Sequence, residues 1–277
     1  DTVGDEMVFS KTANRGIHIA KIEGADLTYD ISKNVAGVVA NEILKNHKVD
    51  FGIELEIYKN FKPGSGLGSS AASAAGAAFA INEFLEKPYS TLELTAFAML
   101  GEEAACGSQI ADNVSAALFG GFVLVRSYDP LDIVKIPVPT DLVVTVLHPQ
   151  IEIKTEDSRN VLPKEIPLKS AITQWANVGG LISGLYTNNY SLISNSLQDV
   201  IIEPVRKKLI PHFDLAKQSA LDAGALGAGI SGSGPTIFAL SKGMETAERV
   251  ANAMRNVYLE TAIPFELNVS KVNNQGI

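Results

Sequence analysis

The residues FGIELEI, numbered 51–57, alternate between hydrophobic and polar side chains. A period of two is typical of a strand with one buried face. Residues 69–86 are rich in alanine, serine and glycine, which predicts a helix that packs closely on its neighbours until Lys87-Pro88 ends it. Valine and isoleucine at helical spacing predict a second helix over residues 32–47, with Ser32 as its cap.

The rest of the chain continues this mixture of strands and helices. Weak alternation within residues 6–22 suggests strands, and Ser90-x-x-Glu93 is a capping box that opens a helix. Further elements are predicted as helices over 168–188, 191–202, 213–223 and 244–257, and as strands over 119–125, 142–147, 237–240 and 265–272. This order favours an α+β fold. A shift to proline and acidic residues places a domain boundary near residue 140, which gives domains 1–140 and 141–277.

The composition narrows the classes of function. The chain has 277 residues, of which 46% are hydrophobic and 19% charged, as expected for a globular protein with a sizeable core. It shows no apolar run of membrane-spanning length and no signal peptide at its start. A single cysteine, Cys106, excludes an intrachain disulfide and favours a reducing cytoplasm. The net charge of −8 argues against nucleic acid or an anionic membrane as the partner.

A glycine-rich segment connects the strand at 51–57 to the helix at 69–86. It reads Pro63, Gly64, Ser65, Gly66, Leu67, Gly68, Ser69 and Ser70. Alternate glycines allow a tight turn and leave the backbone amides accessible. The N-terminus of the following helix adds unpaired N–H groups and a positive dipole end, so the segment predicts a phosphate site. A serine-capped turn without a ligand is the alternative. The string is neither a Walker A loop nor a dinucleotide fingerprint.

The string PGSGLGSSAA at residues 63–72 resembles the phosphate loop of the GHMP kinases, whose signature is Pro-x-x-x-Gly-Leu-Gly-Ser-Ser-Ala. The resemblance implies ATP as co-substrate, Mg²⁺, and a two-domain fold. The N-terminal domain would be like ribosomal protein S5 domain 2 and the C-terminal domain ferredoxin-like, with the site between them. The chain starts at DTVGDEMVFS, without the N-terminal motif of that family, so we expect the sequence to be part of a longer one.

Phosphoryl transfer requires a held γ-phosphate, neutralised charge and a positioned acceptor hydroxyl. For Mg²⁺, which takes one or two protein oxygens beside phosphates, the candidates are the Ser70 hydroxyl and the Glu102 carboxylate. Glu103 is the alternative to Glu102 because the register is uncertain by one residue. A solvated acidic helix end would explain both glutamates without a metal.

The resemblance assigns three further polar residues. Asp112 and Asn113 would face the acceptor hydroxyl, although an Asx turn also explains them. Ile110 stands where homoserine kinases, one branch of the family, commonly carry histidine. Asn34 would hydrogen-bond adenine, and the alternative is a capping asparagine.

The second half of the chain resembles the homoserine kinase branch most closely. Thr155 and Arg159, followed by Asp199-x-x-x-Glu-Pro-x-Arg206, match elements that hold the amino-acid substrate, and an arginine fork suits its carboxylate. A second glycine turn contains Gly232, Ser233 and Gly234, which would approach the phosphate loop. Further matches are FGGF at 119–122 and the ending VNNQG at 272–276.

The resemblance therefore implies a homoserine kinase that phosphorylates the hydroxyl of L-homoserine on the threonine pathway. It also implies a homodimer as a family-level expectation. Two alternatives stay open on the sequence alone. One is another GHMP kinase that acts on a sugar or a mevalonate-like alcohol, and the other is a non-catalytic relative that binds a metabolite.

Overall fold

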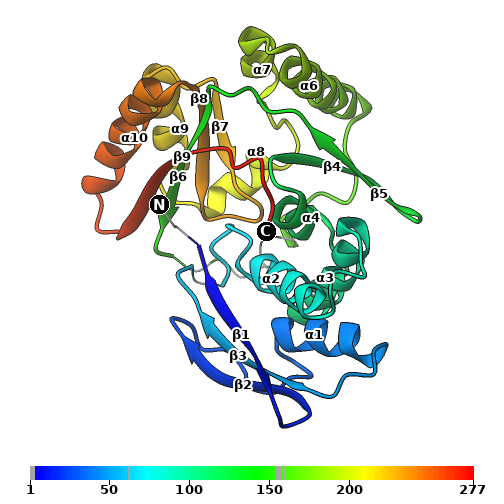
Figure 1. Ribbon diagram of the computed structural model, residues 1–277. Coiled ribbons are helices and arrows are strands. Elements are labelled where there is room, and N and C mark those ends of the chain that lie inside the picture. Colours follow the sequence, from blue (N-terminus) through cyan, green and yellow to red (C-terminus); the bar gives the residue numbers. More distant parts are fainter. Residues whose placement is uncertain (1–3, 62, 152, 154–157, 159) are drawn as a thin grey trace. The chain divides into compact units, whose positions relative to one another are not determined.

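The computed structural model describes residues 4–61, 63–151, 153, 158 and 160–277. The chain forms two compact units, drawn in Figure 1. The first contains Asp1–Pro63, Gly68–Lys135 and Asn273–Ile277, and the second contains Gly64–Leu67 and Ile136–Val272. The main boundary between the two units, after Lys135, lies close to the boundary that the composition suggests at residue 140. No pattern in the sequence indicated, however, that residues 64–67 group with the second unit and residues 273–277 with the first.

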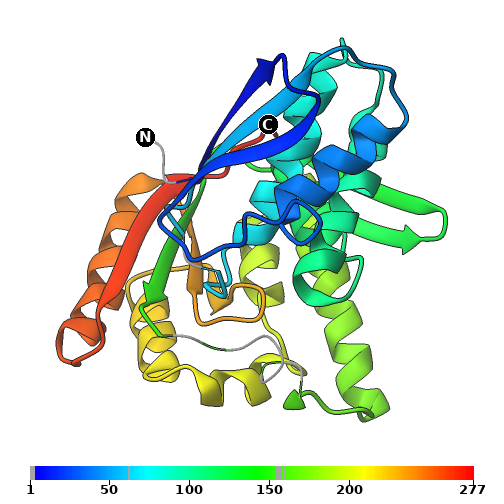
Figure 2. The same ribbon diagram turned by 90° about the horizontal axis from the view of Figure 1, so that it is seen from below.

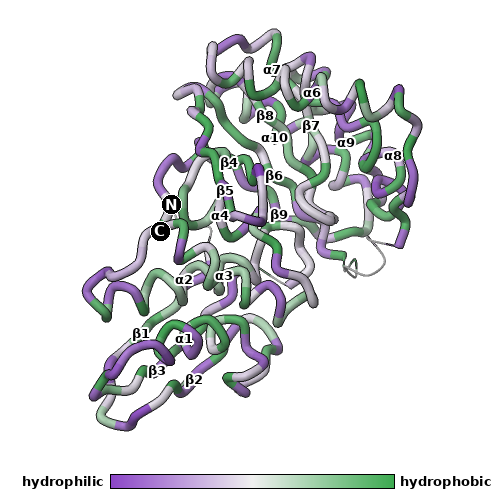
Figure 3. Tube along the Cα trace, turned by 90° about the vertical axis from the view of Figure 1, so that its right-hand side faces the viewer, coloured by the Kyte–Doolittle hydropathy of each residue, from purple (hydrophilic) through white to green (hydrophobic). Residues whose placement is uncertain are grey.

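The first unit is built on a three-stranded sheet in the order β1-β3-β2. Its elements are β1 (Glu6–Thr12), β2 (Gly16–Glu23), α1 (Val35–Lys45), β3 (Gly52–Tyr58), α2 (Ser69–Phe84), α3 (Thr91–Cys106), α4 (Asp112–Phe119), β4 (Phe122–Tyr128) and β5 (Leu131–Ile136). The alternating segment is the central strand β3, antiparallel to β1 and parallel to β2. Hydrophobic and hydrophilic residues alternate along β3, as Figure 3 shows. Strands β4 and β5 form a separate two-stranded ribbon.

Helices α1, α2 and α3 pack together beside this sheet (Figures 1 and 2). Helix α2 buries five alanines, and its small side chains allow close helix contacts, as the sequence predicted. Gly101 of α3 shows how close they are, because a Cβ built there would lie 2.9 Å from the Cβ of Ala74. The capping box of Ser90 and Glu93 at the start of α3 is confirmed. The cap predicted at Ser32 is wrong, because α1 begins after Asn34.

The second unit contains a four-stranded antiparallel sheet in the order β7-β8-β6-β9. Its elements are β6 (Leu142–Pro149), α6 (Leu168–Thr187), α7 (Tyr190–Ser196), α8 (Glu203–Arg206), the 3₁₀ turn η1 (Lys207–Leu209), α9 (Phe213–Asp222), β7 (Gly227–Ile230), β8 (Ile237–Lys242), α10 (Met244–Leu259) and β9 (Phe265–Lys271). Helices α9 and α10 pack on the sheet, and their contacts form the hydrophobic core of this unit. The α+β class is confirmed.

Helix α7 is shorter than the 191–202 segment that the pattern predicted, because it ends at Ser196. The carboxylate of Asp199 accepts hydrogen bonds from the backbone N–H groups of Ile201 and Ile202 at 2.9 and 2.8 Å, and from Glu203 at 3.1 Å. An aspartate that binds following amides competes with helix continuation. The side chain therefore makes a turn and starts α8 instead.

Among the described residues, no helix is both long enough and apolar enough to cross a lipid bilayer.

Candidate functional site

The N-terminus of α2 is open in the way that an anion site requires. Gly64, Gly66 and Gly68 all have positive φ angles, of 78°, 81° and 71°. In the described part of the chain, no side-chain hydrogen bond caps α2, and its first turn carries no acidic residue. The first intrahelical bond at this end runs from Ala72 N to Gly68 O at 2.8 Å. Within the loop, the Leu67 N–H donates to Ser65 Oγ at 3.3 Å. The first amides of α2 have no intrahelical partner, and the dipole of the helix favours negative charge there.

The tip of the glycine loop is held by the second glycine turn, within the second unit. The hydroxyl of Thr236 donates to Ser65 O at 2.6 Å, and that of Ser231 donates to Gly66 O at 2.7 Å. The side chain of His148 is buried and its Nδ1 lies 3.1 Å from the Thr236 hydroxyl. These bonds fix the carbonyl groups of the loop tip, so the turn that follows β7 acts on the conformation of the loop.

Replacing Gly66 by alanine tests this fit. A Cβ at residue 66 would lie 2.6 Å from Ser231 O, and the φ of +81° strains any other residue. We expect the Gly66→Ala variant to lower kcat/KM for ATP by about tenfold or more, since small displacements of a binding loop are costly. Steady-state kinetics at varied ATP measures this loss.

Gly64→Ala is the matched control for that variant. Gly64 has a similar φ of +78°, but a Cβ there would be no closer than 3.7 Å to its nearest neighbour, Ile153 O. The Gly64→Ala variant therefore has the same backbone strain as Gly66→Ala but no steric overlap of its Cβ with a neighbouring atom. Equal losses in the two variants would show that the contact of Gly66 with Ser231 is unimportant.

The side chains of Ser70 and Glu102 meet at the start of α2. The Ser70 hydroxyl lies close enough to the Glu102 carboxylate to lower its pKa. Glu102 is buried on α3, whereas Glu103 is exposed and accepts a hydrogen bond from Gln109 at 2.8 Å. Burial raises the pKa of the Glu102 carboxyl, the Ser70 hydroxyl acts in the opposite direction, and the charge of Asp112 raises it further. Of the two glutamates, Glu102 is therefore the one that faces the loop.

The Glu102 carboxylate has an unsatisfied oxygen. Among the described residues, its Oε1 is buried and has no hydrogen-bond partner. A buried acceptor without a partner costs free energy and requires an explanation. A cation beside this oxygen would satisfy it, and hydroxyl and carboxylate oxygens are the ligands that Mg²⁺ prefers. The donor set of Ser70 and Glu102 therefore fits Mg²⁺. In the described part of the chain, no group of three or more His, Cys, Asp or Glu residues forms a metal cluster.

Asp112 and Asn113 open helix α4, an element that the sequence analysis did not predict. Both side chains are exposed, and Asp112 Oδ1 accepts the backbone N–H of Asn113 at 2.7 Å. A Cβ on Gly68 would lie 3.5 Å from Asn113 Oδ1, so the Asn113 amide lies against the base of the loop. Gly68, Ser70, Glu102, Asp112 and Asn113 thus gather around the start of α2.

Two residues assigned to nucleotide binding are engaged in folding. Asn34 caps α1, because its Oδ1 accepts the N–H groups of Ala36 and Gly37 at 3.1 and 3.3 Å while its Nδ2 donates to Thr28 O. The adenine contact stays a prediction, with only one N–H of the amide left for it. The hydroxyl of Ser69 is buried and donates to Phe61 O at 3.1 Å, so only its backbone N–H faces the anion site.

The residues expected to hold the acceptor substrate are partly described. Arg206 Nε donates to Ser158 O at 3.2 Å and its Nη1 donates to Gly232 O at 3.1 Å. The Ser158 hydroxyl donates to Ser233 O at 2.7 Å. Arg206 therefore braces the second glycine turn, which includes Gly234. Thr155 and Arg159 lie outside the described residues.

Comparison with known proteins identifies the family of this chain. The model of the GHMP kinases N terminal domain matches residues 31–121, and that of the GHMP kinases C terminal region matches residues 181–259. The homoserine kinase of Chlorobium phaeobacteroides is 46% identical over 99% of this chain and 90% of its own length. The chain belongs to the homoserine kinases of the GHMP kinase family. Its two-domain fold is therefore the GHMP kinase fold, and ATP is the co-substrate that the family implies.

Further relatives extend this GHMP kinase assignment. The homoserine kinase of Methanococcus vannielii is 40% identical over 92% of this chain and 84% of its own length. The crystal structure of homoserine kinase from Cytophaga hutchinsonii superposes with a TM-score of 0.95 at 48% identity, covering 100% of this chain and 88% of that one.

The sequence analysis of this GHMP kinase missed two residues beside the loop. Lys59 and Asp5 form a buried ion pair against the first turn of α2. Lys59 follows a strand and precedes the loop, but nothing local distinguishes it from an exposed lysine. Its partner is 54 residues away in the sequence, so no spacing pattern could connect the two.

Proposed function

We propose that this GHMP kinase transfers the γ-phosphoryl group of ATP to the hydroxyl of L-homoserine, giving ADP and O-phospho-L-homoserine. The assignment of homoserine is supported by the names of relatives that are 40–48% identical over most of the chain. The observation that carries the catalytic part is the buried oxygen of Glu102, which has no hydrogen-bond partner among the described residues and lies beside the open N-terminus of α2. It provides a cation site next to a phosphate site.

In this proposal the backbone amides between Gly64 and Ser70, other than the Leu67 N–H that donates to Ser65 Oγ, bind the β- and γ-phosphates, assisted by the dipole of α2. The Ser70 hydroxyl and the Glu102 carboxylate hold Mg²⁺. When bound, Mg²⁺ supplies neutralisation of the negative charge on the triphosphate. The second glycine turn, including Gly232, Ser233 and Gly234, keeps the loop tip in its binding conformation through the bonds of Ser231 and Thr236.

Asp112 and Asn113 orient the acceptor in this mechanism. The hydroxyl oxygen of homoserine forms a bond to the γ-phosphorus, while the bond between that phosphorus and the β–γ bridging oxygen breaks. ADP leaves with the electron pair, and the hydroxyl proton passes to the Asp112 carboxylate or to solvent. Because the transfer is dominated by positioning and charge, an in-line acceptor held by Asp112 supplies most of what the protein must contribute.

Arg206, together with Arg159 and Thr155, is assigned to the amino-acid end of the substrate. A guanidinium group matches a carboxylate with two parallel N–H donors. The Arg206 side chain is half-buried and anchored on two backbone carbonyls, so its position is fixed before any substrate binds. This assignment rests on the resemblance to homoserine kinases.

Acceptor-dependent ADP release tests the proposal. The purified protein is assayed with ATP, Mg²⁺ and one acceptor at a time from homoserine, threonine, serine, mevalonate and galactose. We expect homoserine to give the highest kcat/KM, and Arg206→Ala to raise the KM for homoserine by about tenfold to a hundredfold because the carboxylate loses its anchor. The KM for ATP should stay within about threefold of its original value.

Ser158→Ala is the control for the Arg206 variant. It removes the bond from the Ser158 hydroxyl to Ser233 O and leaves the guanidinium in place. An equal rise of the homoserine KM in both variants would mean that Arg206 acts only on the glycine turn. Higher activity with mevalonate or galactose would identify a different GHMP kinase, and ADP release with none of the acceptors would favour a metabolite-binding relative.

A further inference from the structure

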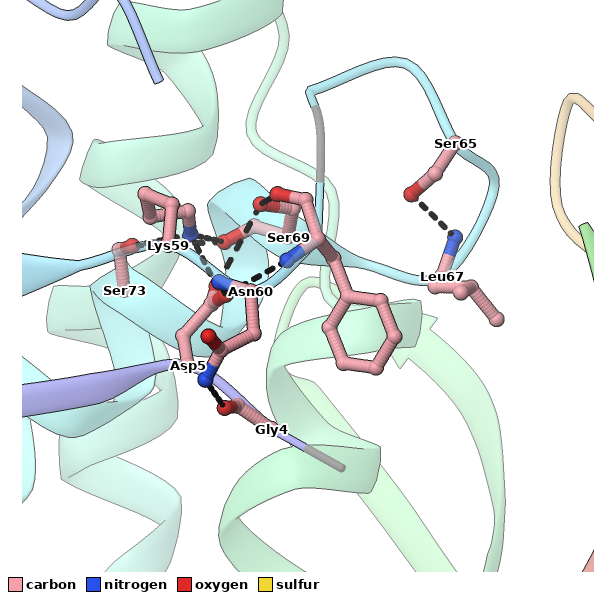
Figure 4. A network of polar contacts seen from close by, with 9 residues as sticks. Gly4, Asp5, Lys59, Asn60, Ser65, Leu67, Ser69 and Ser73 are labelled. Carbon is pink, nitrogen blue, oxygen red and sulfur yellow. Dashed lines mark hydrogen bonds and ion pairs between the residues drawn. The ribbon is translucent and has the colours of Figure 1, made fainter. Parts of the chain in front are cut away.

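A buried lysine lies directly beneath the phosphate loop. Lys59 follows β3, and only 2% of its side chain is exposed. Its Nζ forms an ion pair with the Asp5 carboxylate and donates to Ser69 O at 2.8 Å and to Ser73 Oγ at 3.0 Å. Figure 4 shows the ammonium group surrounded by these three partners. An ammonium group has three N–H donors, and all three are used.

Asp5 connects the same ion pair to the other end of the loop. Its Oδ1 accepts the backbone N–H groups of Asn60 at 2.9 Å and Phe61 at 3.2 Å, where the chain enters the loop. The Ser69 hydroxyl, where the chain leaves the loop, lies 3.4 Å from Asp5 Oδ2 and 3.1 Å from Phe61 O. One ion pair thus holds both ends of the loop, on residues 60–61 and on residues 69–73.

The energetics argue that stability alone does not account for this pair. Desolvation is the largest influence on Lys59 and lowers its pKa, and the hydrogen bond with Asp5 only partly opposes it. A buried ion pair of this kind is often no more stabilising than two apolar side chains of similar size. What the pair adds is a fixed hydrogen-bond geometry at the backbone of Ser69, Asn60 and Phe61.

Building on the proposed kinase function, we propose that Lys59 and Asp5 are positioning residues for ATP. They hold the two ends of the phosphate loop at a set separation, so that the first amides of α2 point at the phosphates. Lys59 does not itself contact phosphate, because its three donors are occupied and its charge is compensated by Asp5. Both members of the pair are needed, since each holds a different end of the loop.

The test compares three variants with the unsubstituted protein: Lys59→Met, Asp5→Asn, and a double variant with Lys59→Met and Asp5→Leu. Binding of ADP with Mg²⁺ is measured by calorimetry, thermal unfolding gives Tm, and steady-state kinetics gives the KM for homoserine. We expect both single variants to weaken ADP binding by about tenfold to a hundredfold. The double variant should regain Tm relative to Lys59→Met, because it buries an apolar pair, but should not regain ADP affinity. The homoserine KM should change by less than about threefold.

Lys33→Met is the matched control, because Lys33 is an exposed lysine of the same unit whose side chain is 75% exposed. It should leave ADP binding unchanged. Recovery of ADP affinity together with Tm in the double variant would overturn the proposal and leave only a structural role. Weaker binding in Lys59→Met but not in Asp5→Asn would overturn it in favour of a direct contact between Lys59 and phosphate.

The ADP affinity of the unsubstituted protein distinguishes a failure of this inference from a failure of the proposed function. Absence of ADP binding before any substitution would contradict the kinase assignment itself. Normal binding that none of the three variants changes would contradict only the role of the ion pair.

Discussion

Replacing Glu102 by glutamine is expected to lower kcat by about a thousandfold at saturating ATP and homoserine. The substitution keeps the size of the side chain and removes the charge that would hold Mg²⁺. Loss of one preorganised electrostatic group at a reacting phosphate typically costs 10²–10³ in rate, and loss of metal binding adds to it. The coupled assay for ADP release, repeated over a range of Mg²⁺ concentrations, measures the effect, and the Mg²⁺ requirement should move to higher concentration.

Glu103→Gln is the control that the chain itself offers. Glu103 is adjacent in sequence, has the same side chain and is exposed. Its replacement should leave kcat within about twofold of the original value. If Glu103→Gln abolished turnover while Glu102→Gln did not, the metal ligand would be the neighbouring residue and the burial argument would fail.

The same Glu102→Gln substitution should make the protein more stable without ligands. Burial raises the pKa of the Glu102 carboxyl above the 4.5 of an unperturbed glutamate. The stabilisation linked to this group is therefore fully present below pH 4.5 and is lost as the pH rises through the raised value. Above the raised pKa the ionised carboxylate is a cost, which glutamine removes. Tm of the variant should exceed that of the unsubstituted protein by ~2 °C or more at pH 7, with the difference shrinking toward pH 4.5.

The structural features that sequence reasoning anticipated are those that depend on local chemistry. The positive φ angles of Gly64, Gly66 and Gly68, the capping box at Ser90 and the central strand β3 all follow from short patterns. The preference for Glu102 over Glu103 is supported by the structure, because only one of two adjacent helical residues can face α2.

The parts that sequence reasoning missed depend on contacts between distant residues. Thr236 and Ser65 are 171 residues apart, and Ser231 and Gly66 are 165 apart, so no local pattern indicates that one glycine turn holds the other. The pairing of Lys59 with Asp5 is hidden for the same reason.

Two errors in the secondary structure have a common physical cause. Asn34 and Asp199 are short polar residues whose side chains bind nearby backbone amides. Asn34 starts α1 later than Ser32 would, and Asp199 replaces the expected end of α7 with a turn. Hydrophobic spacing continues through both positions, so periodicity alone cannot detect the side-chain bonds that set these boundaries.

Replacing Asp112 by asparagine is the second substitution with a large expected effect. The two side chains have the same shape, but the amide cannot accept a proton and carries no charge. If Asp112 removes the hydroxyl proton of homoserine, kcat should fall by about a thousandfold, within the 10²–10⁴ range of general-base catalysis. The KM for ATP should change by less than about threefold, because Asp112 opens α4 and is not part of the loop that binds the phosphates.

The size of the loss in kcat tests proton abstraction in the Asp112→Asn variant. Asp129→Asn, at an exposed aspartate of the same unit, should leave kcat unchanged. Turnover of Asp112→Asn close to that of the unsubstituted enzyme would exclude proton abstraction by Asp112. Catalysis would then rest on the alignment of the hydroxyl and on charge neutralisation around the open end of α2, since an alcohol is too weak an acid to be ionised beforehand.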